Sequence, residues 1–202
     1  MHKFIAMVGT NSDESTNRKL LQFMQTHYAD QAEMELMEIK DLPVFNKPES
    51  LQIPEQAQAM AAKIEEADGV IISTPEYDHS APAALMNALE WLSFHIKPFA
   101  DKPVMIMGAS YGALGTSRAQ AHLRQILDSP ELKARIMPSS EFMLGHSLQA
   151  FDDAGQLTDN QKVAQLDSLF GEFQMFVEIT KKLKNSHAAT YQDVRGMDWT
   201  KL

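Results

Sequence analysis

The feature of this sequence that most constrains the fold is a polar loop between an apolar run and an amphipathic stretch. The apolar run, residues 4–8, is long enough for a buried strand and too short for a surface helix. After the loop at residues 9–17, apolar side chains return at helical spacing. A strand that turns directly into a helix points the free N–H groups of the helix start at one place. Such a turn is suited to bind a phosphate group.

The same succession of strand, polar turn and helix recurs along the chain. Apolar runs at 69–74 and 104–107 are followed by small or hydroxyl-rich turns at 74–80 and 108–115, and then by helical spacing. An imperfectly alternating strand at 34–39 and a short strand at 134–137 complete the pattern. Strands that alternate with helices form a mostly parallel sheet covered on both faces. The sequence therefore predicts an α/β protein.

The three polar turns follow the first, third and fourth predicted strands, and so belong to the same edge of the sheet. In open parallel sheets, ligands bind beyond the carboxyl ends of the strands, where the strand order reverses. In a flavodoxin-like three-layer sandwich, a five-stranded sheet of order 2-1-3-4-5, the first and third strands flank that point. The turns are expected to converge there on one site.

Composition and charge argue against several classes of function. The 202 residues include 18 Lys and Arg against 27 Asp and Glu, a formal net charge of −9, with no basic block. Nucleic acid is therefore not an expected partner, because its phosphates are bound by basic side chains. The absence of cysteine excludes disulfides and thiolate catalysis. The seven histidines show no ligand spacing, so no metal site is expected.

The sequence also carries no pattern of a membrane or secreted protein. No stretch approaches the roughly 18 apolar residues of a membrane span. The first residues do not form a signal peptide. We therefore expect a cytoplasmic protein with no membrane partner.

Three motifs in the polar turns resemble those of the NAD(P)H-dependent FMN reductase family, a flavodoxin-like group that includes flavin, quinone, azo and chromate reductases. The family's loop Gly-Ser-x-Arg-x-x-Ser-x-Asn is matched at Gly9, Thr10, Ser15 and Asn17. Its Pro-Glu-Tyr-Asn turn and the following Leu-Lys-Asn-Ala-x-Asp-Trp are matched by 75–78 and 85–91, and its Ser-x-Gly-x-x-Gly turn by 110–115. The resemblance covers about residues 3–183.

This resemblance implies an oxidoreductase that passes electrons from NADH or NADPH through bound FMN to a small acceptor, such as a flavin, a quinone or an azo compound. The first loop would hold the FMN phosphate and the other two turns would contact the ring. The flavin carries the chemistry, so no catalytic residue is expected. The residues expected to bind the cofactor are Thr10, Ser12, Ser15, Thr16, Asn17, Pro75, Glu76, Tyr77, Asp78, Ser110, Tyr111, Gly112 and Gly115.

The chain departs from the family pattern at several of these positions. Ser12 stands where the family has an arginine, so a strong charge-assisted contact to phosphate is missing and weaker FMN binding is expected. Asp13 and Glu14 follow it, and we expect both to face solvent. A bare helix cap is the alternative interpretation of this loop. Asp78 replaces an asparagine and Met86 a lysine.

Two other functions remain open at this point: a flavodoxin-type electron carrier, and an α/β protein that has lost its flavin. The Pro-Glu-Tyr turn and the Leu-x-Asn-Ala helix argue against the carrier. In that helix Asn87 is expected to support the second turn, and Trp91 to lie in the core. Met86, Trp91 and Phe94 favour a homodimer, with a tetramer left open. We expect a reductase domain at 1–184 and a tail at 185–202 that contacts a partner subunit.

Overall fold

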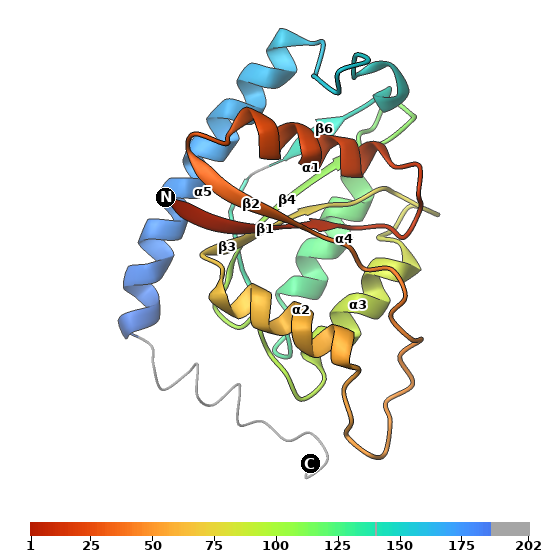
Figure 1. The fold of residues 1–202 in the computed structure, drawn as a ribbon, viewed down its shortest axis with the longest axis vertical. Helices are drawn as coiled ribbons and strands as arrows, with labels where there is room; N and C mark the ends of the chain where they lie inside the picture. The colour runs from red at the N-terminus through yellow and green to blue at the C-terminus, as the bar shows by residue number, and fades with distance from the viewer. Residues whose placement is uncertain (140, 187–202) are drawn as a thin grey trace.

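A parallel sheet forms the middle layer of the computed structural model, which describes residues 1–139 and 141–186 (Figure 1). The strands that form its main path are β1 (His2–Val8), β2 (Ala32–Met37), β3 (Gly69–Ser73), β4 (Pro103–Ala109) and β5 (Arg135–Ile136). They follow the order β2-β1-β3-β4-β5, and every neighbouring pair is parallel. The predicted fold class and strand order are confirmed.

The sheet has one strand more than the sequence predicted. This strand, β6 (Phe142–Leu144), pairs with the end of β4, whereas β5 pairs with its start. The two short strands therefore share one edge position beside β4. The chain leaves the sheet between them at Pro138, whose nitrogen has no hydrogen to donate to a ladder. The predicted strand at 134–137 corresponds to β5, and β6 was not predicted.

Helices cover both faces of the sheet, as Figure 1 shows. Their bounds are α1 (Thr16–His27), α2 (Glu55–Glu66), α3 (Ala83–Ser93), α4 (Ser117–Leu127) and α5 (Asn160–Ser186), with a short 3₁₀ helix η1 (Ser147–Gln149). Along β1, Phe4 and Ala6 join one hydrophobic cluster with α1 and α5, and Ile5 and Met7 join another with α2, α3 and α4. The alternation of a buried strand thus supplies two cores.

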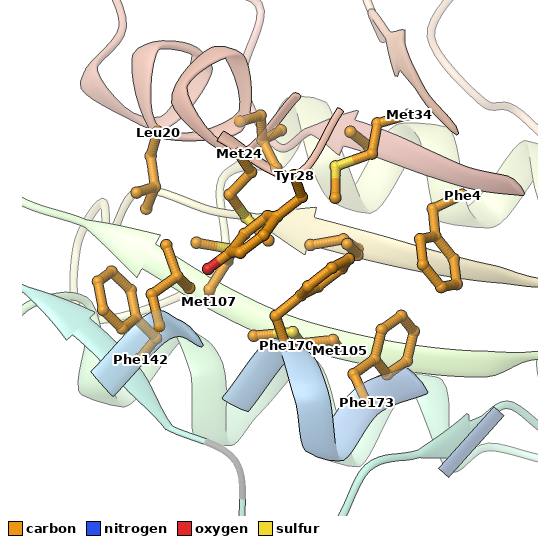
Figure 2. Close-up of a cluster of buried hydrophobic side chains, with 14 of the residues drawn as sticks. Phe4, Leu20, Met24, Tyr28, Met34, Met105, Met107, Phe142, Phe170 and Phe173 are labelled. Carbon is orange, nitrogen blue, oxygen red and sulfur yellow. The ribbon is translucent and has the colours of Figure 1, made fainter. Parts of the chain in front are cut away.

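The cluster between the sheet, α1 and α5 is rich in aromatic and methionine side chains (Figure 2). The rings of Tyr28 and Phe170 stack with their centroids 4.0 Å apart. Phe4 lies against Phe170 and Phe173, at 5.9 and 5.2 Å. This packing fixes α5 across the face that also holds α1.

The last helix extends further than the predicted domain boundary. α5 continues to Ser186, beyond residue 184, and the rest of the predicted tail lies outside the described residues. The division into a domain and a tail stays a prediction. In the part of the chain that the structure describes, no helix has the length and apolar character needed to cross a membrane.

Candidate functional site

The turns after β1, β3 and β4 line one cleft at the carboxyl edge of the sheet. Its volume is about 360 Å³. Its walls are formed by Ser12, Glu14, Ser15, Thr16, Asn17, Pro75, Glu76, Tyr77, Ala109, Ser110, Tyr111 and Gly112. The structure thus brings the three turns together, as the strand order predicts. That these residues bind FMN stays a prediction.

One buried amide, that of Asn17, connects all three turns. Its Nδ2 donates to the main-chain oxygen of Ala109 at 2.8 Å. Its Oδ1 accepts from the N–H of Ala109 at 2.8 Å and from the hydroxyl of Ser73 at 2.9 Å. The residue is only 2% exposed. Its side chain therefore joins the start of α1 to the ends of β3 and β4.

The first loop fits a phosphate group. Ser15 caps α1, because its hydroxyl accepts from the N–H of Arg18 at 3.2 Å. Thr16 and Asn17 stand in the first turn of α1, where N–H groups have no acceptor within the helix. These donors, the hydroxyls of Ser12 and Ser15 and the positive end of the helix dipole all border the cleft. The chemistry of this set suits the phosphate end of FMN.

The two acidic residues of this loop behave differently. The side chain of Asp13 is 90% exposed and pairs with Lys40, and its hydrogen bond to that ammonium lowers the pKa of the carboxyl. Glu14 is also exposed, but it borders the cleft. The expectation that both face solvent is confirmed, although Glu14 also lies at the border of the cleft.

In the second turn, the carboxylate of Glu76 binds the start of α4. Its Oε2 accepts from the N–H groups of Arg118 and Ala119 at 2.9 and 3.2 Å, and its Oε1 accepts from the Arg118 guanidinium at 3.0 Å. Burial alone would raise the pKa of Glu76, but these hydrogen bonds outweigh it and the pKa lies below its usual value. Thr116, at the cap position of α4, makes no side-chain cap. Glu76 supplies the cap instead.

Asp78 lies at the tip of the second turn and does not line the cleft. Tyr77 and Ser80 exchange main-chain hydrogen bonds of 3.1 and 2.9 Å, which closes a two-residue turn. Asp78 and His79 have φ angles of 50° and 63°, a left-handed conformation in which asparagine and glycine are favoured. Tyr77 stays 51% exposed. Of the predicted contacts in this turn, the structure places Pro75, Glu76 and Tyr77 at the cleft.

Two further predicted residues, Thr10 and Gly115, lie beneath the cleft rather than at its surface. Thr10 is 1% exposed, and its hydroxyl accepts from the N–H of Ser12 at 3.2 Å. Gly115 has a φ of 56°, and a Cβ there would lie 2.5 Å from the Cβ of Met143. It is therefore required for packing under β6. Thr10, Asp78 and Gly115 are not among the residues that line the cleft, and their part in binding FMN stays a prediction.

Two contributors to the site were missed in the sequence. Ala109 lines the cleft, although in the predicted third turn its apolar side chain did not mark it as a binding residue. Ser147 adjoins it: its N–H donates to the oxygen of Ser110 at 3.0 Å, and its hydroxyl lies 2.8 Å from that of Thr16. Ser147 is fully buried. No motif marks it, and only its place after a strand beside β4 explains its position.

The helix after the second turn is covered by a loop of the same chain. The side chain of Asn87 accepts from the N–H of Phe45 at 2.7 Å and donates to the oxygen of Pro43 at 3.1 Å. The expectation that Asn87 supports the second turn is therefore wrong. Trp91 is 3% exposed, which confirms its place in the core, and its Nε1 donates to Pro43 at 2.7 Å. The ring of Phe45 contacts those of Trp91 and Phe94.

The side chains that could bind a metal ion are dispersed in the part of the chain that the structure describes. Within residues 1–139 and 141–186 no group of three or more His, Cys, Asp or Glu is placed to hold a metal ion. The cleft is bordered by hydroxyl, aromatic and main-chain groups, together with Glu14, Glu76 and the buried amide of Asn17.

Residues 2–149 match the model of the NADPH-dependent FMN reductase family. The chain is 57% identical over 190 residues to the NADH:(hydroxy)cinnamate reductase subunit CrdA of Vibrio ruber, with 94% of each chain covered. It is 46% identical to the NADH-dependent flavin reductase subunit 2 of Lactobacillus johnsonii, and the match covers 89% of this chain and 100% of that chain.

A solved structure agrees with these relatives. The flavoenzyme NAD(P)H:(acceptor) oxidoreductase FerB of Paracoccus denitrificans superposes with a TM-score of 0.75 at 29% identity, and the match covers 90% of this chain and 98% of that chain. Both the sequence relatives and this fold neighbour are oxidoreductases by name. The chain therefore belongs to the NADPH-dependent FMN reductase family, and it is a flavin-dependent oxidoreductase that uses NAD(P)H as its electron donor.

Proposed function

We propose that the cleft binds FMN with its phosphate on the loop from Ser12 to Thr16 and its ring system between Pro75–Tyr77 and Ser110–Gly112. The observation that carries this proposal is that three turns from distant parts of the sequence line the same cleft. FMN bound there would supply the redox chemistry, since it takes a hydride from a reduced nicotinamide and passes the electrons to an acceptor. The residues around the cleft would hold the cofactor and the reactants in place.

Two exposed aromatic rings support this placement. Tyr77 and Tyr111 lie on the two turns assigned to the flavin ring and are 51% and 58% exposed. Their flat apolar surfaces suit a flat conjugated molecule. The cleft is open at this side, so donor and acceptor use the same space in turn. The acceptor that fits is a small conjugated molecule such as a quinone, a flavin or an azo compound.

The names of the relatives support NADH as the donor. Both the Vibrio ruber and the Lactobacillus johnsonii proteins are named as NADH-dependent or NADH-oxidising enzymes. We expect NADH to reduce the flavin of this protein faster than NADPH does, and stopped-flow reduction with each nucleotide measures this. Rapid bleaching without a protein partner distinguishes an enzyme from a flavodoxin-type carrier.

The position of the phosphate can be tested with Ser15→Asp. Aspartate also caps helices, so α1 is retained, while a negative charge is added where the phosphate is proposed to bind. We expect FMN affinity to fall by about tenfold or more through charge repulsion. Riboflavin, which has no phosphate, should bind with unchanged affinity. Flavin fluorescence quenching measures both.

Ser168→Asp is the matched control, because Ser168 is exposed on α5, outside the residues that line the cleft. It should change neither affinity. Equal FMN binding by the wild-type protein and Ser15→Asp would contradict the proposed place of the phosphate.

A second candidate function is that of an electron-donor subunit in a larger reductase. It is supported by two relatives that are each named as a subunit. In this case the purified chain should oxidise NADH but turn over an organic acceptor slowly until the second subunit is added. Fast turnover of a quinone by the chain alone would favour the single-component enzyme.

The assembly proposed for this chain is a homodimer, which the family resemblance implies. Large apolar side chains exposed near the cleft, Tyr77, Tyr111 and Leu114, give such a contact a suitable surface. Multi-angle light scattering measures the mass: two chains support the proposal, one contradicts it, and four would show that dimers pair into tetramers. A cytoplasmic location is proposed as well, because the donor is a soluble nicotinamide nucleotide.

A further inference from the structure

The first loop has Ser12 in place of the arginine of the family motif, yet another arginine contacts the loop from α1. The Nη1 of Arg18 donates to the main-chain oxygens of Ser12 and Asp13, both at 2.8 Å. We propose that Arg18, held by Glu38, is a positioning residue that shapes this loop for the FMN phosphate. This inference rests on the proposed function, and it adds a residue that acts on the phosphate site without touching the ligand.

The guanidinium of Arg18 is held on two sides. Its Nε and Nη2 donate to the two carboxylate oxygens of Glu38 at 2.6 and 2.8 Å, which is the forked geometry of a strong charge-assisted pair. The hydrogen bond to Glu38 raises the pKa of Arg18. The side chain of Arg18 is 15% exposed. Because the planar group is bound along two edges, its direction relative to the loop is fixed.

The carbonyls that Arg18 binds decide where the neighbouring N–H groups point. The oxygens of Ser12 and Asp13 belong to the same peptide units as the N–H groups of Asp13 and Glu14. In a trans peptide unit the C=O and N–H bonds point in opposite directions. The N–H groups of Asp13 and Glu14 therefore point away from the guanidinium. Consecutive N–H groups that share a direction form a nest for an anion.

The position of the loop side chains agrees with this arrangement. Glu14 borders the cleft, while Asp13 is turned outward to Lys40. The guanidinium also polarises the two peptide groups, which makes their N–H bonds better donors to a phosphate. Arg18 thus compensates for the arginine missing at Ser12 by organising the main chain.

A neighbouring ion pair provides a matched comparison. Lys63 of α2 binds Glu35 of β2 at 2.5 Å, and both side chains are 52% exposed. This pair connects α2 to β2, as the Arg18–Glu38 pair connects α1 to the residue after β2, and neither Lys63 nor Glu35 lines the cleft. A loss of binding caused only by removing a surface ion pair would appear in both cases.

The experiment compares FMN and riboflavin binding to the wild-type protein, Arg18→Met, Glu38→Gln and the control Lys63→Met. Flavin fluorescence quenching measures affinity, and urea unfolding measures stability. We expect Arg18→Met to weaken FMN binding by about tenfold or more. Glu38→Gln keeps the shape of the side chain that binds the Arg18 guanidinium, so it should weaken FMN binding less than Arg18→Met does. Riboflavin affinity should stay within about twofold for every variant.

The results distinguish a failure of the role given to Arg18 from a failure of the proposed FMN phosphate site. Unchanged FMN affinity in Arg18→Met, or an equal loss of FMN and riboflavin affinity, overturns the role of Arg18 alone. If Arg18→Met does not fold, Glu38→Gln decides by the same comparison of the two flavins. A wild-type protein that binds riboflavin as tightly as FMN overturns the proposed phosphate position and the role of Arg18 together.

Discussion

Asn17 and Ala109 are 92 positions apart in the chain, yet the side chain of Asn17 hydrogen-bonds both main-chain groups of Ala109, each at 2.8 Å. A carboxamide carries a donor and an acceptor in one plane, so it pairs with a peptide as a neighbouring strand would. Asn17 lies in the first turn of α1, and Ala109 ends β4. This contact therefore sets the distance between two walls of the cleft independently of any ligand.

Asn17→Ala is expected to lower the free energy of unfolding by about 2–4 kcal/mol, because buried polar groups of Ala109 and Ser73 lose their partner. FMN affinity should fall as well, since the turns are no longer held together. Urea unfolding and flavin fluorescence measure the two effects. Asn46→Ala, at an exposed loop position, is the control and should change stability by less than about 0.5 kcal/mol. Equal stabilities for the two variants would refute the role given to Asn17.

Tyr28→Phe tests the link between α1 and α5. The hydroxyl of Tyr28 donates to Asp167 at 2.9 Å, and burial, with the hydrogen bond to this carboxylate, raises the pKa of the phenol above its usual 10.0. A raised pKa in the folded state stabilises the protein fully below the unfolded pKa, and this contribution is lost as the pH rises. We expect Tyr28→Phe to cost about 1 kcal/mol near neutral pH.

The pH dependence supplies the stricter test of Tyr28. Above about pH 10 the wild-type protein should lose stability faster than Tyr28→Phe, because only the wild-type protein must keep a buried phenol protonated. Urea unfolding at neutral and alkaline pH measures the difference between the two proteins. A difference that stays constant with pH would contradict the assignment. FMN affinity should not change, because Tyr28 does not line the cleft.

Glu76→Gln removes the charge that caps α4 while it keeps the shape of the side chain. At neutral pH we expect a loss of about 1 kcal/mol in unfolding free energy. The folded pKa of Glu76 lies below the usual 4.5, so its contribution is present above that value and is lost as the pH falls through the folded pKa. The difference from wild type should therefore narrow below about pH 4.

Urea unfolding over an acid pH series measures this effect, and Glu49→Gln, at an exposed loop position, is its control. The control should match the wild-type protein at neutral pH. If Glu76→Gln were as stable as the control throughout the series, the capping role of Glu76 would be wrong.

Asn87→Ala is expected to loosen the loop that covers α3. The variant loses the hydrogen bonds to the main chain of Phe45 and Pro43. The glutamate-specific protease Glu-C should then cleave faster after Glu49, an exposed residue of the same loop. Limited proteolysis with mass spectrometry measures the rate. Ser93→Ala, at the end of the same helix, serves as the control, and cleavage at the same rate in both variants would contradict the prediction.

The elements and the meeting point of the turns could be predicted because they depend on local pattern. Runs of buried residues such as 69–74 report a central strand, and the right-handed crossover rule then leaves few topologies. The strand β6, which continues the sheet edge that β5 begins, could not be predicted in this way. It is too short to show a period, and its edge position depends on pairing with β4.

The roles of single side chains were predicted less well, because a motif specifies a residue type and not the direction of its side chain. Glu76 matches its motif, yet its carboxylate binds α4. Asn87 also matches its motif, yet its side chain holds the loop at Phe45, 42 positions away in the chain. In both cases the partner comes from a distant part of the chain. Only the packing of helices and loops decides such partners.

The sequence by itself determined the order of strands and helices, and with it the edge of the sheet at which the polar turns meet, because periodicity and chain crossover are local properties. The tertiary structure alone decided which polar groups remain available at that edge. Asn17, Glu76 and Arg18 are turned to partners within the protein, while main-chain N–H groups and hydroxyls border the cleft. The physical reason is that a buried hydrogen-bonding group must find a partner, and the available partners are known only when the chain is folded.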